Sequence, residues 1–100
     1  MKELIDLVQK WSIDKGLHEA DPKRQMLKLG EEVGELFEGI GKERPQQIID
    51  SIGDIQVVLI ILCQQLYLDY EDTLRIAYEE IRGRKGKMID GIFVKSEDIK

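Results

Sequence analysis

One hundred residues suffice for one domain of about three or four helices around a modest core, and are too few for two ordinary cores. With 42% hydrophobic and 35% charged residues and two prolines, the composition excludes disordered and collagen-like chains. Fifteen Lys and Arg against twenty Asp and Glu give a formal charge of −5, which argues against duplex DNA binding through a general basic surface.

The single cysteine, Cys63, can form neither an internal disulfide nor a thiolate zinc cage, so we expect a reducing, cytoplasmic setting. Residues 1–10 are rich in charge and lack the continuous apolar run of an export signal, so no secretion is expected. The most apolar stretch, residues 55–63, is about half as long as the roughly 20 residues that cross a bilayer. It indicates a buried helix and no membrane partner.

Helical spacing of apolar residues predicts a first helix over about residues 2–15. A second helix is expected from Asp21, because a capping Asp precedes a proline at the first helical position, and it should end near Gly41. Pro45 opens a third, largely apolar helix that extends to about residue 68. Within it, Gly53 indicates the close approach of another element.

The last part of the chain is predicted to form a fourth helix that ends near Gly83, followed by a turn. Asp69 or Asp72 is expected to cap this helix. Asp90-Gly91 between apolar pairs predicts a two-residue hairpin turn, hence a short β-ribbon or an ordered loop. The expected fold is all-α: one domain over residues 1–100, built as an antiparallel bundle of about four helices. Homodimerisation should complete the bundle, because the apolar third helix would otherwise leave apolar surface exposed.

One stripe of the second helix is charged, since four of its residues fall within about a 100° arc. They are Lys28, Glu31, Glu32 and Glu35. The apolar residues on the opposite side are Met26, Leu29, Val33, Phe37 and Ile40. Taken alone, such a stripe is typical of a solvated face with an ordinary Lys–Glu ion pair.

Asp54 lies among apolar residues of the third helix. A carboxylate in such surroundings must find a cation, accept several hydrogen bonds or take up a proton. Asp50 and Ser51 are one turn earlier and could face the same space. The alternative is an ordinary ion pair of Asp54 with Lys28, Arg75 or another cation.

Antiparallel packing of the second and third helices would bring four acids around one cavity. These acids are Glu32, Glu35, Asp50 and Asp54. Oxygen ligands favour Mg²⁺ or Mn²⁺, whereas zinc and iron sites usually recruit His or Cys, and His18 stands outside any metal-type spacing. No Glu-x-x-His motif for a di-iron site and no calcium-loop pattern occurs. A magnesium site of this kind keeps positions open for substrate phosphates.

Two further features bear on substrate binding. Arg84, Lys85 and Lys87 are interleaved with glycine and could hold a phosphate chain, although a basic end is more often simply solvated. Trp11 is the only tryptophan, for which core packing is the ordinary role and base stacking the alternative.

The stretch Glu31-Glu32-Val33-Gly34-Glu35-Leu36, followed by Ile52-Gly53-Asp54-Ile55, resembles the signature of the MazG-like all-α nucleotide pyrophosphohydrolases. That signature reads Glu-Glu-x-x-Glu and, a helix later, Glu-x-x-Asp. The resemblance covers about residues 20–96, and the chain ending is similar to that of the small single-domain members of phages and Gram-positive bacteria.

The resemblance implies magnesium-dependent cleavage of a nucleoside triphosphate to the monophosphate and pyrophosphate, by a homodimer or a pair of dimers. It implies that Glu32, Glu35 and Asp54 are metal ligands and that Glu31 is a further metal- or water-binding acid. The family usually has Glu where this chain has Ser51, and Asp50 could replace it.

The expected mechanism is in-line attack of water on the α-phosphorus. Lys28 and the tail cations Arg84, Lys85 and Lys87 would stabilise the leaving pyrophosphate.

A hypothesis of a different class is a non-catalytic helical interaction module, in which the acidic stripe is surface charge and divalent ions have no effect. A regulator that touches RNA or DNA through its basic end has the least support, and no specific nucleic-acid binding is expected. The preferred base and sugar, and normal versus damaged nucleotides, stay open.

Overall fold

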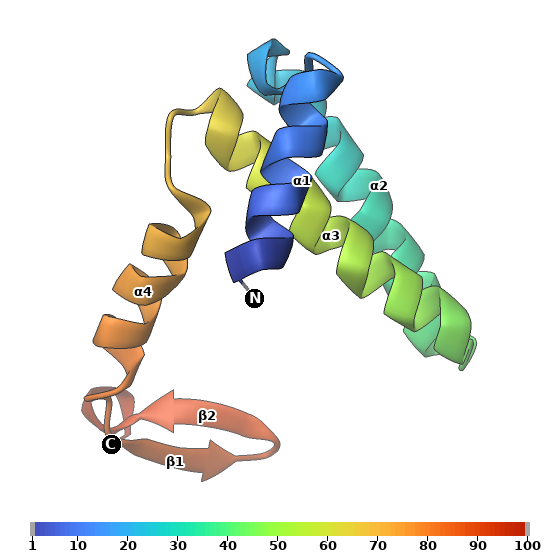
Figure 1. Ribbon diagram of the computed structural model, residues 1–100. Helices are drawn as coiled ribbons and strands as arrows, with labels where there is room; N and C mark the ends of the chain where they lie inside the picture. Colours follow the sequence, from blue (N-terminus) through green and yellow to red (C-terminus); the bar gives the residue numbers. More distant parts are fainter. Residues whose placement is uncertain (1, 100) are drawn as a thin grey trace. The chain divides into compact units, whose positions relative to one another are not determined.

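The computed structural model describes residues 2–99 and is mostly helical (Figure 1). Its elements are α1 (Lys2–Asp14), η1 (Leu17–Glu19), α2 (Pro22–Gly41), α3 (Pro45–Gln65), α4 (Tyr70–Ile81), β1 (Gly86–Ile89), β2 (Ile92–Lys95) and η2 (Ser96–Asp98). The chain divides into two compact units, Met1–Tyr70 and Glu71–Lys100. The predicted helices and hairpin are confirmed; homodimerisation stays a prediction.

Local signals set the helix ends. The Asp21 side chain accepts a hydrogen bond of 2.9 Å from the Lys23 amide, and Pro22 occupies the first turn, as expected for the start of α2. The third helix ends at Gln65, earlier than predicted. Tyr67 there adopts φ 59°, and the Leu68 amide donates to the Cys63 carbonyl at 2.8 Å, which closes the helix end.

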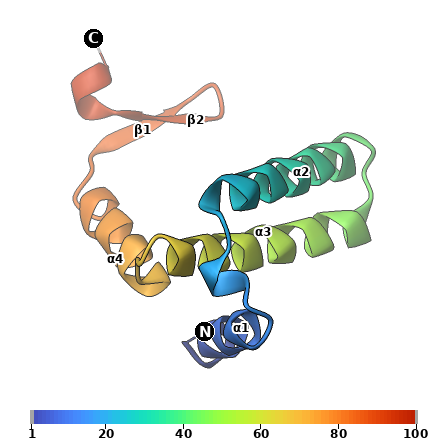
Figure 2. The same cartoon turned by 90° about the horizontal axis from the view of Figure 1, so that it is seen from above.

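The first unit is built on the antiparallel pair α2–α3, which both views show side by side and joined by a short turn (Figures 1 and 2). This pairing was predicted and is confirmed. The close approach is at Gly39, where an added Cβ would lie 3.2 Å from Ile48 Cγ1. The prediction of a close approach at Gly53 is wrong, because Gly53 is exposed and a Cβ there would meet nothing within 4 Å.

The core of the first unit is small. Within residues 2–70, the buried apolar residues are Val58, Ile60 and Ile61, all on α3. The expectation of a buried helix over residues 55–63 holds in part, since Val58, Ile60 and Ile61 are buried whereas Gln56, and Ile52 just before the stretch, are exposed. The helix α3 is long and apolar enough to cross a membrane. Core helices of soluble proteins meet the same criterion of length and composition, so this is weak evidence for a membrane span.

Glutamine side chains tie α1 and η1 to α3. Gln64 Nε2 donates to the Gln9 carbonyl at 3.1 Å, and Gln65 Nε2 donates to the Leu17 carbonyl at 3.0 Å. These bonds join carbonyls in the middle of α1 and in η1 to α3, so they hold the first helix against the third.

In the second unit, α4 precedes the antiparallel hairpin of β1 and β2, with Ile89 opposite Ile92. Asp90 and Gly91 have φ of 50° and 79°, the left-handed values that a tight hairpin turn requires. The predicted two-residue turn is confirmed.

Candidate functional site

An open cavity of about 530 Å³ lies between α2 and α3 and is lined by acidic side chains. Its residues are Glu35, Glu38, Gln47, Asp50, Ser51 and Asp54. The structure therefore brings three of the four predicted acids, Glu35, Asp50 and Asp54, to one space.

The fourth acid, Glu32, lies on the α3-facing side of α2 and is 5% exposed. Its Oε1 is 3.3 Å from Lys28 Nζ, and its buried Oε2 has no hydrogen-bond partner among the described residues. The interpretation of Glu32 as part of a solvated face is wrong. The residue is buried because Gln25, Glu32 and Gly39 recur every seven residues and together face α3.

The predicted apolar side of α2 is largely exposed instead. Met26 is 51%, Phe37 75% and Ile40 59% exposed in the single chain. The helix thus packs through the boundary between its charged stripe and its apolar side, and this leaves an apolar face without a partner in the first unit.

The acids of α2 and α3 influence one another electrostatically. The negative charge of Glu32 is the main cause that raises the pKa of Glu35 above its ordinary value, and Asp54 adds to the effect. A hydrogen bond to Glu32 and its charge raise the pKa of Lys28. The carboxylates of Glu32, Glu35 and Asp54 therefore form one repulsive group, beside which Lys28 stays protonated.

The remaining acids differ in how their charge is compensated. Glu38 Oε1 accepts from Arg44 Nη1 at 3.1 Å, and Glu38 Oε2 is 3.8 Å from Lys42 Nζ. Asp50 Oδ1 accepts a bond of 2.9 Å from Gln46 Nε2, which carries no charge. Glu38 is thus neutralised by cations, whereas Asp50 is only hydrogen-bonded.

Asp54 is exposed at the cavity, so the expectation that its helix buries it is wrong. Among the described residues, the alternative of an ion pair between Asp54 and Lys28 is not seen either. Lys28 pairs with Glu31 and Glu32. Arg75 pairs within its own helix, with Glu71 and Asp72.

The donor set of this cavity fits a hard cation, because all the charged groups that line it are carboxylates. Glu32 does not line the cavity, but its buried Oε2 on the same helix as Glu35 lacks a partner among the described residues. Within residues 2–99, however, no three His, Cys, Asp or Glu side chains are gathered as a group that could hold a metal ion. The acids line an open space rather than a closed cage.

Sequence reasoning missed Glu38 and Gln47. Glu38 continues the spacing of the acidic stripe one turn beyond Glu35, which was an available signal. Gln47 follows Pro45 in the first turn of α3, and its role depends on bonds across the helix pair that no local pattern reveals. Glu31 is exposed, 3.9 Å from Lys28, and does not line the cavity.

Trp11 borders an apolar pocket of about 370 Å³ in the first unit. The pocket is formed by Trp11, Leu17, Ala20, Asp21, Arg24, Gln25, Lys28, Val57, Val58 and Ile61. Trp11 is 50% exposed, so its expected role as a core residue is wrong for the single chain. Lys28 lines this pocket and also contacts Glu32, which links the pocket to the acids.

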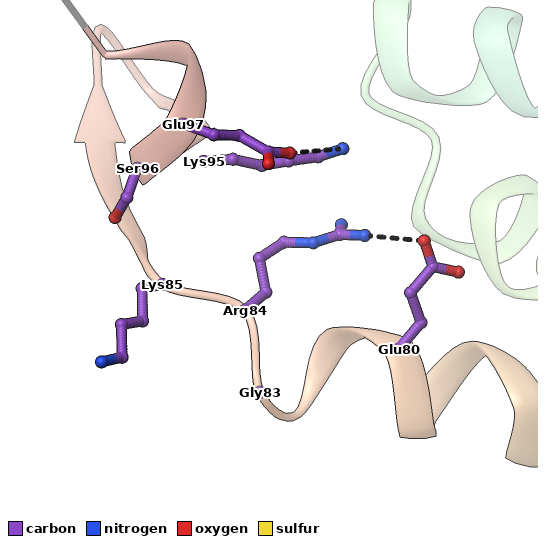
Figure 3. Close-up of a pocket in the computed structure, with 7 residues that line it drawn as sticks. All are labelled: Glu80, Gly83, Arg84, Lys85, Lys95, Ser96 and Glu97. Carbon is purple, nitrogen blue, oxygen red and sulfur yellow. Dashed lines mark hydrogen bonds and ion pairs between the residues drawn. The ribbon is translucent and has the colours of Figure 1, made fainter.

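The predicted tail cations lie in the second unit, where a pocket of about 540 Å³ contains Arg84 and Lys85 (Figure 3). Arg84 is paired with Glu80 at 3.1 Å, which compensates its charge. The Lys85 side chain points away from Arg84 in Figure 3. Lys87 is on β1 and does not line the pocket.

Comparisons with known proteins identify the family of the chain. The model of the MazG nucleotide pyrophosphohydrolase domain matches residues 20–89. An uncharacterized 18.2 kDa protein from the rep-hol intergenic region of Haemophilus phage HP1 (strain HP1c1) is 43% identical over 70 residues. The match covers 69% of this chain but only 43% of the phage protein, so the chain spans less than half the length of this relative. No solved structure matches the chain.

Proposed function

Because the chain belongs to the MazG nucleotide pyrophosphohydrolase family, we propose that it hydrolyses a nucleoside triphosphate, with ribose or deoxyribose, to the monophosphate and pyrophosphate. The single observation that carries this proposal is the cavity between α2 and α3, into which Glu35, Asp50 and Asp54 converge. Uncompensated carboxylates at one place are unfavourable unless a cation joins them.

The proposed ligands of Mg²⁺ or Mn²⁺ are Glu35 and Asp54, two lining acids that form no ion pair with a described residue, together with the unpartnered Oε2 of Glu32. Asp50 is the proposed fourth ligand, in place of an acid at Ser51. When bound, the cation would neutralise phosphate oxygens and activate a water.

The chain's own residues would orient the reactants. Lys28 is held between Glu31 and Glu32 and kept protonated by the latter, so it is suited to stabilise the leaving pyrophosphate. Glu31 is exposed beside it and would hold the attacking water. Both proposed roles rest on the position of Lys28 and Glu31 on α2, beside Glu32.

We assign the apolar pocket at Trp11 to the base of the nucleotide, because indole offers a flat stacking surface and Lys28 is shared with the acidic group. Arg84, Lys85 and Lys87 are proposed phosphate contacts on the strength of their charge.

The proposed partner is a second copy of the chain, in a homodimer or a pair of dimers. The outer face of α2, which we define as Met26, Val33, Phe37 and Ile40, repeats every three, four or seven residues as an interhelical face does. Three of its four residues are exposed in the single chain. Two copies could cover these faces by packing as a bundle.

The test is pyrophosphate release from a panel of ribo- and deoxyribonucleoside triphosphates with Mg²⁺. We expect Glu35→Gln and Asp54→Asn to lower turnover by about 100-fold or more while the helical circular dichroism is kept. Asp14→Asn is the matched control, since Asp14 forms an ion pair with exposed Lys10 on α1 and does not line the acidic cavity. Parent turnover in both site variants would overturn the assignment, and absence of release together with metal-independent melting would favour a helical interaction module.

A further inference from the structure

Gln47 makes hydrogen bonds from α3 to α2 at the edge of the acidic cavity. Its Nε2 donates to the backbone carbonyl of Glu35 at 2.9 Å and to Glu38 Oε1 at 3.3 Å. Its Oε1 accepts from Arg44 Nη1 at 3.4 Å. The side chain is half-buried and thus holds the backbone of the residue that carries a proposed ligand.

Glu38 helps to hold the Gln47 amide in place by accepting its second hydrogen bond. Its carboxylate is compensated by Arg44 and Lys42, so it has less need of another cation than Glu35 or Asp54. The close approach of Gly39 to Ile48 lies at the same place, where an added Cβ would be 3.2 Å from Ile48 Cγ1. The α2–α3 distance is therefore set at this end of the cavity.

The proposed ligands on α3 follow from Gln47 along one side of the helix. Asp50 and Asp54 are three and seven residues after it, a spacing that places all three on the same stripe, and all three line the cavity. Because a helix is rigid over two turns, fixing Gln47 against the Glu35 carbonyl also fixes the distance from Glu35 to Asp50 and Asp54. Repulsion between Glu35 and Asp54 acts against this contact.

We propose that Gln47 is a positioning residue: its amide bridge from α3 to the Glu35 carbonyl sets the spacing of the carboxylates and thereby the affinity of the cavity for a divalent cation. This inference rests on the proposed function in that it takes the cavity as the cation site. Groups that orient metal ligands typically change affinity by about 10- to 100-fold when they are removed.

The experiment measures Mn²⁺ binding to the full chain by the electron paramagnetic resonance of free Mn²⁺, without substrate. Gln47→Met keeps the length of the side chain but cannot donate, and we expect its Mn²⁺ dissociation constant to rise about 10-fold. If the Met variant does not fold, Gln47→Asn takes its place. This variant keeps the amide but is one methylene too short to reach the Glu35 carbonyl, so we expect the same weakening of Mn²⁺ binding. The matched control is Gln56→Met, because the Gln56 amide donates to the Ile52 carbonyl of its own helix at 3.4 Å and does not line the acidic cavity.

A second variant separates positioning from ligation. Glu38→Gln can still accept the bond from Gln47, so we expect Mn²⁺ affinity within about twofold of the parent, whereas Glu35→Gln should lose binding. Parent-like affinity in folded Gln47 variants, or a Glu38→Gln loss as large as that of Glu35→Gln, would overturn the proposal. A parent that binds no Mn²⁺ would overturn it together with the cation site. Mn²⁺ binding that responds to Gln47, without triphosphate hydrolysis, would support it while the proposed function fails.

Discussion

At the scale of single residues, Glu32 shows how burial and pairing determine what a carboxylate can do. One oxygen lies against Lys28 at 3.3 Å, while the other is buried without a partner. An unsatisfied buried carboxylate oxygen costs free energy, and the nearby charge of Glu35 adds repulsion. A bound cation would relieve both the unsatisfied oxygen and the repulsion. Neutralising Glu32 therefore tests whether a cation binds beside it.

We expect Glu32→Gln to abolish the stabilisation of the protein by Mn²⁺ while the metal-free melting temperature changes by only about 4 °C or less. The small second effect follows because the variant loses the Lys28 ion pair but also loses the repulsion and the buried charge. Thermal melting with and without millimolar Mn²⁺ measures both quantities, since an ion that binds only the folded state must raise the midpoint. A metal-induced shift equal to that of the parent would contradict a role of Glu32 in binding.

Glu35 gives a prediction of pH dependence for the metal-free protein. Its pKa is raised above the ordinary value of 4.5, first by the charge of Glu32 and also by Asp54, with Lys28 opposing. The folded state therefore holds this proton more tightly than the unfolded chain, and stability falls as pH rises from the ordinary value through the raised one. Below the ordinary value both states are protonated and the effect vanishes.

Glu35→Gln should accordingly unfold at a higher urea concentration than the parent at pH 7, and the difference should disappear below about pH 4. Urea titrations of both proteins in the presence of a chelator, over this pH range, provide the measurement. Lys28 is charged throughout the range in either protein, so it does not contribute to the difference. Equal midpoints at pH 7 would show that Glu32 and Asp54 do not destabilise the ionised Glu35.

At the scale of elements, α2 contains glycines in two different surroundings. A Cβ at Gly30 would meet nothing within 4 Å, whereas one at Gly39 would meet Ile48 Cγ1 at 3.2 Å and the Ile48 amide nitrogen at 3.3 Å. Alanine favours a helix over glycine by about 1 kcal/mol. We expect Gly30→Ala to gain up to about 1 kcal/mol of unfolding free energy.

For Gly39→Ala we expect no net gain, because backbone of α3 must move to admit the methyl group and the bonds of Gln47 lie beside it. Urea denaturation of both variants against the parent gives the two free energies. A gain for Gly39→Ala equal to that for Gly30→Ala would show that the helix pair separates easily at this end.

The helices and the hairpin show which structural features the sequence can predict. Asp21-Pro22 and Asp90-Gly91 act through their own backbone, so the start of α2 and the hairpin turn are readable without knowledge of the fold. The convergence of Glu35, Asp50 and Asp54 followed from antiparallel pairing alone, although the fourth predicted acid, Glu32, does not line the cavity. The burial of Glu32 did not, because periodicity shows that a helix is amphipathic but not how far it is rotated toward its neighbour. The hydrogen bonds of Gln47 could not be predicted either, because they join two different helices.

At the scale of the whole molecule, exposed apolar side chains outnumber buried ones. Val58, Ile60 and Ile61 are the buried apolar residues among those described. Large apolar residues of α1, α2 and α4 are exposed by half or more, among them Leu4, Phe37 and Ile76. Within the first unit, the exposed apolar residues Met26, Phe37 and Ile40 of α2 form the kind of helix face that is typical of an interface.

We expect sedimentation equilibrium to give a mass of at least two chains for the parent at about 100 µM, because dimerisation would cover the outer face of α2. Phe37→Glu should raise the dimer dissociation constant by about 10-fold or more, since Phe37 is 75% exposed in the single chain and a carboxylate at an apolar interface would be desolvated. Tyr67→Glu is the matched control, because Tyr67 is an exposed aromatic residue just beyond the end of α3.

A monomeric parent would contradict the proposed bundle. Equal dissociation constants for Phe37→Glu and the parent would place any interface on a face other than that of Met26, Val33, Phe37 and Ile40.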